Sequence, residues 1–299
     1  MKFVLRCLAA PRVDYSLIGL YRFLRIVHFQ IPTLSEHQNE MLRLLIRECA
    51  FPLSKEIFQR YMKLIPTIVK IEDAFFITHD FEDLYHAQLF YEKKTLAFIL
   101  ENFRNGNVFV DVGANIGGYT IRLGKRGTTY AFEPNPRNYQ VLVANVNLNG
   151  VRSAHIFSTL VGNQSRRANL YLSKFHGRHS MLGRGEYTDV KTVTLDSALG
   201  TLNRIHILKI DVEGAEPTVL SGAEETLKRT VCVVVETSGS QEKHTTMFLT
   251  SRGFEFVKRC EANSIFINTD LLGEQEIGSA QNPTVVSNEI CSPVTRALF

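Results

Sequence analysis

A short segment rich in glycine and acid is the part of the chain best suited to bind a ligand. It reads DVGANIGG over residues 111–118, directly after an apolar run and directly before a helical pattern. The glycines allow a tight turn and let a ligand approach the backbone closely. Glu133 ends the next apolar run, 22 residues after Asp111, where an acid can hydrogen-bond both hydroxyls of a ribose. The spacing predicts a nucleoside site; the alternative is a glycine-rich turn without a ligand.

The same segment indicates which nucleoside would fit. Its glycines follow the pattern G-x-x-x-G-G, so the dinucleotide fingerprint G-x-G-x-x-G is absent, and no G-K-S/T of a P-loop follows. Asp111 would repel a pyrophosphate at this turn, whereas it tolerates a cation. S-adenosylmethionine carries a sulfonium and an amino group and has no phosphate. The pattern therefore favours S-adenosylmethionine over NAD.

The elements that must position these residues alternate regularly from residue 108 onward. Such alternation of apolar runs with helical patterns predicts a doubly wound α/β fold, with a mostly parallel sheet and right-handed crossovers. Two segments of half-buried strand pattern, 168–172 and 190–195, interrupt the order and predict an inserted pair near the mouth of the sheet. The expected strands cover 108–111, 128–132, 154–157, 205–211 and 231–236, and the expected helices cover 119–123, 139–148 and 214–228.

Several motifs follow one another in a fixed order along the chain. They are VDVGANIGGYT from residue 110, AFEPNP from 131, NVNLNG from 145, TLDSAL from 194, LKIDVEGAE from 208 and Val235-Glu236. Together they resemble the motifs of the FkbM family of S-adenosylmethionine-dependent methyltransferases, over about residues 90–240. Tyr91-Glu92 and His179-Ser180 also look like family features. The resemblance implies a class I methyltransferase fold, which is Rossmann-like, and O-methylation of a hydroxyl on a sugar, a glycan or a polyketide-like metabolite.

The resemblance also implies which residues bind the methyl donor. After the third strand the family commonly has small residues and then Gly-Asp, whereas this chain has Gly162-Asn163. The amide of Asn163 can still hydrogen-bond adenine where the family has a carboxylate. The other residues expected to bind S-adenosylmethionine are Asp111, Gly113, Asn115, Gly117 and Glu133.

Acids at the ends of two later strands are the candidates for the transfer step. Asp211 and Glu213 follow the apolar run 205–210, and Glu236 ends the next expected strand. A hydroxyl nucleophile must lose its proton or bind a metal through its oxygen, so these carboxylates are candidate bases. The alternative for Glu213, and more strongly for Glu216, is an acid favoured at a helix N-terminus. A divalent metal is conceivable, but no pattern supports one.

Histidines and cysteines add one further candidate. His179 lies in a polar, basic loop, residues 174–180, expected above the site, which makes it a candidate base or substrate contact; otherwise it is an ordinary surface histidine. His79 and His86 lie among acids with no recognised metal spacing, so a solvated charged turn is favoured. The five cysteines are scattered and form no C-x-x-C, which argues against a zinc ribbon or a disulfide scaffold.

Charge and residue patterns along the 299 residues indicate three parts. Residues 1–70 hold 11 Lys and Arg against 5 Asp and Glu, a net charge of +6, whereas the rest hold 23 against 25, a net of −2. Helical apolar spacing and prolines predict a helical N-terminal extension over 1–70. Residues 71–270 are expected to form the methyltransferase domain, and the polar, turn-rich residues 271–299 a flexible tail.

The sequence also bears on location. No segment is apolar enough to span a membrane, because Arg22 and Arg25 interrupt the most apolar early stretch. Residues 16–28 could lie on a membrane surface as a basic amphipathic helix, although a helix docked on the main domain is favoured. Arg6 interrupts a signal-like start, and the scattered cysteines suit a reducing compartment, so a cytoplasmic protein is expected.

Three functions remain in competition. An O-methyltransferase with a small-molecule or glycan acceptor is favoured. An RNA or protein methyltransferase would have to use the basic residues 1–70, but no aromatic and basic groove is visible, so nucleic acid is not favoured as a partner. The third is a donor-binding scaffold without turnover, against which the intact acids Asp111, Glu133, Asp211 and Glu213 argue.

Overall fold

The computed structural model describes residues 67–79, 81–173, 179–182, 184–237 and 240–272. Most of the expected N-terminal extension, including its basic stretch 16–28, and nearly all of the expected tail lie outside the described residues. The chain divides into two compact units after Leu84. In the first unit, β1 (Thr67–Ile71) and β2 (Ala74–Thr78) form an antiparallel hairpin, and helix α5 (Phe81–Gln88) begins.

A seven-stranded sheet organises the second unit, with the order β5-β4-β3-β9-β10-β12-β11. The first five strands of this order run parallel, and β12 is antiparallel to both of its neighbours. This arrangement confirms the predicted mostly parallel sheet. The strands are β3 (Val108–Val112), β4 (Thr128–Phe132), β5 (Ala154–Phe157), β9 (Ile205–Ile210), β10 (Thr230–Glu236), β11 (Phe254–Cys260) and β12 (Asn263–Asn268).

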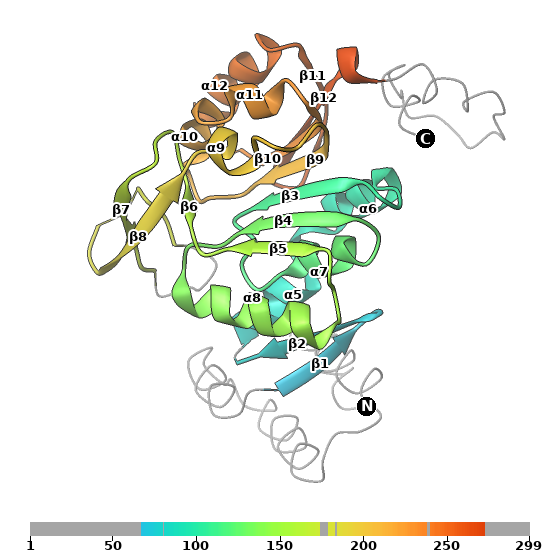
Figure 1. Cartoon of the computed structure of the whole chain (residues 1–299), viewed down its shortest axis with the longest axis vertical. Helices are drawn as coiled ribbons and strands as arrows, with labels where there is room; N and C mark the ends of the chain where they lie inside the picture. The colour runs from blue at the N-terminus through green and yellow to red at the C-terminus, as the bar shows by residue number, and fades with distance from the viewer. Residues whose placement is uncertain (1–66, 80, 174–178, 183, 238–239, 273–299) are drawn as a thin grey trace, which may run out of the picture. The chain divides into compact units, whose positions relative to one another are not determined.

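Helices cover both faces of this sheet, which confirms the doubly wound α/β fold (Figure 1). Alternate residues of a strand point to opposite faces. Phe109 and Ile207 pack with residues of α6 and α7, whereas Val110 and Leu208 pack with residues of α9 to α12. The helices are α6 (Lys93–Asn102), α7 (Gly118–Gly124), α8 (Pro136–Leu148), α9 (Leu195–Leu199), α10 (Glu216–Ser221), α11 (Glu224–Leu227) and α12 (Ser240–Thr250).

The inserted segment forms a small separate sheet of β6 (Leu160–Val161), β7 (Arg167–Tyr171) and β8 (Tyr187–Val193), in the order β6-β8-β7. Leu160, Leu170 and Val190 form its core. The expected inserted pair is therefore present, with its second strand displaced toward the N-terminus.

Two short helices complete the described fold: η1 (Phe90–Glu92), between α5 and α6, and η2 (Thr269–Leu271), after β12. Among the described residues, no helix has the length and apolar character needed to cross a membrane.

Candidate active site

Parallel strands bring the predicted acids to one edge of the sheet. β3, β4, β9 and β10 run in the same direction, and Asp111, Glu133, Asp211 and Glu236 lie at or directly after their carboxyl ends. Ligands of open α/β sheets bind beyond these ends. The fold therefore joins Asp111 and Asp211, which are 100 residues apart in the sequence, at the place where a ligand is expected.

The turn after β3 requires glycine at two of the predicted positions. Gly113 has a φ of +90°, and a Cβ there would lie 1.8 Å from the backbone oxygen of Asp211. Gly117 has a φ of +95°, and its Cβ would lie 2.7 Å from Cδ1 of Leu142 on α8. Side chains are strained at such φ values. Gly113 thus allows the turn after β3, called the donor turn below, to contact the turn after β9.

Two backbone amides hold the carboxylate of Glu133. The N–H of Asn115 donates to Oε2 (2.8 Å), and the N–H of Asn135 donates to Oε1 (2.9 Å). Burial raises the pKa of Glu133 to about 7, because these hydrogen bonds offset only part of the effect of burial. Each carboxylate oxygen has a second lone pair for a ligand hydroxyl, so the geometry suits the ribose contact predicted for Glu133.

Asp111 and Asn115 occupy the same turn. Asp111 is buried on the α7 side, where Thr120 Oγ1 donates to its Oδ2 (2.6 Å); burial raises the pKa of Asp111, and the charge of Lys209 counters part of the rise. Asn115 has a φ of +51°, and its buried Oδ1 has no hydrogen-bond partner among the described residues. An amino or hydroxyl group of S-adenosylmethionine would satisfy that oxygen, so the residues present fit this donor.

Asn163 lies apart from this group. It is exposed, and its Cα lies against Gly222, the residue that ends α10, where an added Cβ would approach it to 3.0 Å. The Glu133 carboxylate accepts its hydrogen bonds from the backbone of Asn115 and Asn135. Contact between Asn163 and adenine therefore stays a prediction.

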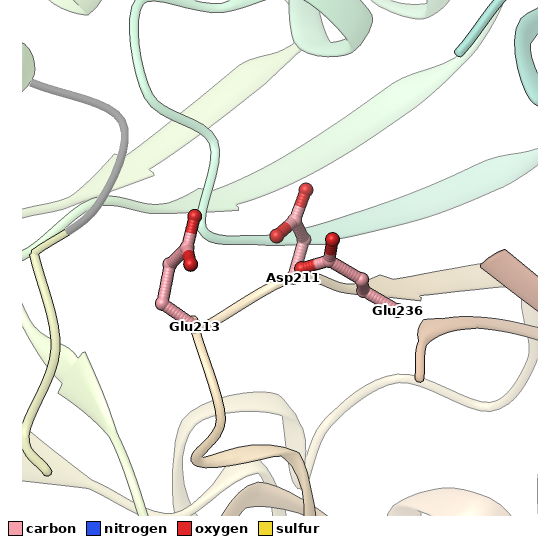
Figure 2. Close-up of side chains that lie close together, drawn as sticks. All are labelled: Asp211, Glu213 and Glu236. Atoms are coloured by element: carbon pink, nitrogen blue, oxygen red, sulfur yellow. The ribbon is translucent and has the colours of Figure 1, made fainter. Parts of the chain in front are cut away.

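Asp211, Glu213 and Glu236 form an acidic cluster at the ends of β9 and β10 (Figure 2). Each offers a carboxylate oxygen, and these three oxygens lie within 4.8 Å of one another. Figure 2 shows the Glu236 carboxylate beside that of Asp211, with Glu213 on the other side. The cluster could hold a divalent cation or accept the hydroxyl of an acceptor. The structure thus brings together three of the four predicted catalytic residues.

The backbone around Glu213 is strained and firmly held. Its φ of +53° lies in the left-handed region, which non-glycine residues rarely adopt. Ser180 Oγ donates to the Glu213 carbonyl oxygen (2.9 Å), and Gln241 Nε2 donates to that of Gly214 (3.0 Å). The Glu216 carboxylate accepts the N–H of Gly214 (3.1 Å), so Glu216 serves the turn. Strain maintained by surrounding contacts is typical of functional sites.

Ionisation differs between neighbouring acids of the cluster. Burial alone would raise the pKa of Asp211, but the charge of Lys209 and its hydrogen bond outweigh burial, so the pKa is lowered. Burial, together with the charge of Asp211, raises the pKa of Glu236 to about 9. At neutral pH Asp211 is therefore a carboxylate, and Glu236 carries the proton of the hydrogen bond between them.

Lys209 and Glu92 received no role from the sequence, yet both belong to this site. Lys209 Nζ lies 2.8 Å from Asp211 Oδ2 and 3.5 Å from Glu92 Oε1. Burial alone would lower the pKa of Lys209, but these two acids more than reverse that effect, and the amine stays charged. The usable signal was a lysine within the apolar run 205–210, because a buried charge requires a partner.

The histidines have other partners. The backbone N–H of Ser173 donates to Nδ1 of His179 (3.0 Å), so the neutral ring carries its hydrogen on Nε2 and that atom cannot act as a base. His79 pairs with Asp83 (3.3 Å), and His86 Nδ1 hydrogen-bonds the Tyr91 hydroxyl (2.9 Å). In the described part of the chain, neither His79 nor His86 belongs to a group of three side chains that could hold a metal.

Comparison with known proteins finds similarity to methyltransferases. Residues 111–256 match the family model of the methyltransferase FkbM domain. The chain is 27% identical to the hexuronic acid methyltransferase AglP of Haloferax volcanii over 48% of this chain and 62% of that protein. It is 25% identical to Methyltransferase 1 of Beauveria bassiana over 47% of this chain and 66% of that protein. The chain thus spans less than two thirds of the length of both relatives.

Among solved structures, a SAM-dependent methyltransferase from Aquifex aeolicus is similar with a TM-score of 0.38 and 15% identity, covering 62% of this chain and 92% of that one. The sheet order, with β12 as its antiparallel strand, and the acid-flanked glycine turn define a class I methyltransferase fold. The match of residues 111–256 to the model of the methyltransferase FkbM domain confirms the resemblance inferred from the motifs.

Proposed function

We propose that the protein transfers the methyl group of S-adenosylmethionine to a hydroxyl oxygen of a sugar, a glycan or a related metabolite. The main support is the meeting of the donor turn and the acidic cluster at one edge of the sheet, where Gly113 packs against the backbone of Asp211. A nucleoside held at Glu133 would extend over Gly113 toward Asp211. The ribose site and the candidate bases would then lie at the two ends of one ligand.

On the donor side, Glu133 would accept hydrogen bonds from the ribose hydroxyls, and Gly113 and Gly117 would let the nucleoside approach the turn. Asn115 Oδ1 would accept a hydrogen bond from a donor N–H or O–H. When bound, S-adenosylmethionine supplies a methyl group on a positively charged sulfur. The carboxylates around this edge suit that positive charge, whereas NAD would place a pyrophosphate beside Asp111.

On the reaction side, Asp211 would accept the hydrogen bond of the acceptor hydroxyl and align its oxygen for in-line displacement. As the bond from the acceptor oxygen to the methyl carbon forms, the bond from that carbon to the donor sulfur would break, leaving neutral S-adenosylhomocysteine. The acceptor O–H bond would break at the same time, and its proton would pass to the Asp211 carboxylate. Glu236 would keep its own proton and donate it in the hydrogen bond to the Asp211 carboxylate. Glu213 would orient the acceptor from the strained turn, and His179 would donate to it through Nε2–H.

The acceptor class is proposed from a relative and from the site together. AglP is named a hexuronic acid methyltransferase, and a sugar hydroxyl needs a hydrogen-bond acceptor of the kind that the acidic cluster provides. A hexuronic acid also has a carboxylate, which an acidic cluster would repel. The hydroxyl of such a sugar is therefore the favoured methylation site, with a methyl ether as the product.

Two measurements test this proposal. Calorimetry should show binding of S-adenosylmethionine and of S-adenosylhomocysteine, and much weaker binding of NAD; tight NAD binding without donor binding would refute the donor assignment. Labelled donor should then transfer its methyl group to glucuronic or galacturonic acid glycosides. Alkali releases the label from a methyl ester but not from an ether, so base-stable label supports O-methylation of a hydroxyl. Label in RNA alone would instead support the RNA methyltransferase.

A further inference from the structure

Lys209 is a buried charge that the transfer step described above leaves unused. It lies inside β9, and its side chain is 3% exposed. Its amine faces the α7 side of the sheet, 5.0 Å from the ring centroid of Tyr119. Burying a lysine costs free energy unless an opposite charge or hydrogen bonds compensate it. The partners of Lys209 therefore indicate its role.

Those partners form a line from β12 to the reaction site. Asn263 Nδ2 on β12 donates to Glu92 Oε1 (2.6 Å). The same oxygen lies 3.5 Å from Lys209 Nζ, which lies 2.8 Å from Asp211 Oδ2. The side chains of Glu92 and Lys209 are only 4% and 3% exposed, whereas that of Asp211 is 22% exposed. The buried members therefore hold the one member that solvent and ligands can reach.

We propose that Lys209 is a positioning residue for methyl transfer: braced by Glu92, it fixes the direction in which the Asp211 carboxylate meets the acceptor. One oxygen of Asp211 is occupied by the Lys209 amine, and Glu236 contacts the same carboxylate. A side chain fixed from two directions keeps the alignment that in-line displacement needs. This inference rests on the proposed function.

The test removes Lys209 together with Glu92, so that neither of these two charges stays buried without the other. Lys209→Met with Glu92→Gln keeps the net charge, and the amide oxygen introduced at position 92 can still accept from Asn263. The matched control is Lys228→Met with Glu225→Gln, which removes the exposed ion pair of α11, 2.6 Å between Nζ and Oε1. Glu92→Gln alone keeps Lys209 and serves as an intermediate variant.

We expect the double variant at 209 and 92 to be folded and to bind S-adenosylhomocysteine with a dissociation constant within about threefold of the parent value. Its kcat on a glucuronic acid glycoside should be lower by about 10²-fold, which is the scale of the effect of a small misalignment. The KM for the acceptor should change little, and Glu92→Gln alone should lower kcat by a smaller factor. The control pair at 228 and 225 should match the parent.

Crystal structures of the parent and the double variant provide a readout that needs no acceptor. The proposal predicts a displaced Asp211 carboxylate, or two conformers of it, in the variant. An unmoved Asp211 with parental kcat would overturn the proposal, and so would a loss of donor affinity equal to the loss of kcat, which would place Lys209 in the donor pocket. A parent that methylates no uronic acid refutes the proposed acceptor, while the Asp211 position still decides the role of Lys209.

Discussion

The two halves of the site are built by different means. The donor half comprises the turns after β3 and β4, and its geometry is set by the backbone. Gly113 permits close contact with the backbone of Asp211, and two backbone amides donate hydrogen bonds to Glu133. The reaction half lies beyond β9 and β10, and its geometry is set by charges. Lys209 forms an ion pair with Asp211 and keeps it ionised, and the negative charge of Asp211 helps to keep Glu236 protonated. The contrast teaches that changes in the first half should weaken donor binding, and changes in the second should slow turnover.

The largest effect expected from this contrast is in the reaction half. Asp211→Asn keeps the side-chain volume and an oxygen that can accept from Lys209, but it removes the proton acceptor. We expect turnover to fall by about 10²–10⁴-fold, the usual contribution of a general base, with a near-parental donor dissociation constant. Methyl-transfer assays measure turnover, and calorimetry measures the donor dissociation constant, on the same protein.

Asp189→Asn is the matched control for this prediction, because Asp189 is an exposed partner of Arg167 on the small sheet. It should turn over like the parent. If Asp211→Asn also does so, the base is to be sought at Glu213. If it loses donor affinity and turnover equally, the division between the two halves is wrong.

A smaller effect is expected in the donor half. Glu133→Ala removes hydrogen bonds from the ribose to a charged acceptor, which should cost roughly 1.5–3 kcal/mol, about 10- to 150-fold in affinity. Turnover at saturating donor should change much less. Calorimetry with S-adenosylhomocysteine measures the loss, and Glu225→Ala, on the surface of α11, is the control. An unchanged dissociation constant would remove Glu133 from the ribose role.

The same contrast explains how far the sequence could be interpreted. The donor half was predictable because its residues are close in the chain: strand, glycine turn, helix and Glu133 fit within 108–133, and each leaves a local pattern. The reaction half was only partly predictable. Asp211 directly follows β9, and Glu236 is the last residue of β10, so both could be found from strand ends. The partner that lowers the pKa of Asp211 is Lys209. Lys209 in turn contacts Glu92, and that contact depends on packing between distant segments.

The fold shows the same limit. All five expected parallel strands are present, because strands buried on both faces are continuous apolar runs. The pair β11 and β12 was not predicted, although β12 is buried along its whole length. Its place between β10 and β11 is set by pairing across the sheet, which no local pattern specifies. The described residues likewise leave the expected domain boundaries as predictions.

The pH dependence of donor binding sharpens the comparison further. Because burial raises the pKa of Glu133 to about 7, its carboxylate becomes protonated as the pH falls through that value, and the protonated form accepts ribose hydroxyls poorly. Donor affinity should therefore be highest above pH 7 and fall by about three- to tenfold between pH 8 and pH 6. In Glu133→Gln, whose amide does not titrate, calorimetry should give a flatter profile; an equally steep one would assign the effect to another group.

The smallest effect is expected at Ser180, where the inserted segment meets the reaction half. Its Oγ donates to the Glu213 carbonyl oxygen (2.9 Å) and accepts the N–H of Leu182 (3.1 Å). Ser180→Ala removes one bond from a strained turn, and an ordinary hydrogen bond contributes about 0.5–1.5 kcal/mol. Because Glu213 then has more freedom, we expect turnover to fall about two- to tenfold without a change in donor affinity. Ser221→Ala removes an exposed bond of the same kind, 2.9 Å from Ser221 Oγ to Thr218 O on α10, and should leave turnover unchanged. Equal effects of the two variants would mean that the contact at Ser180 supports only the fold.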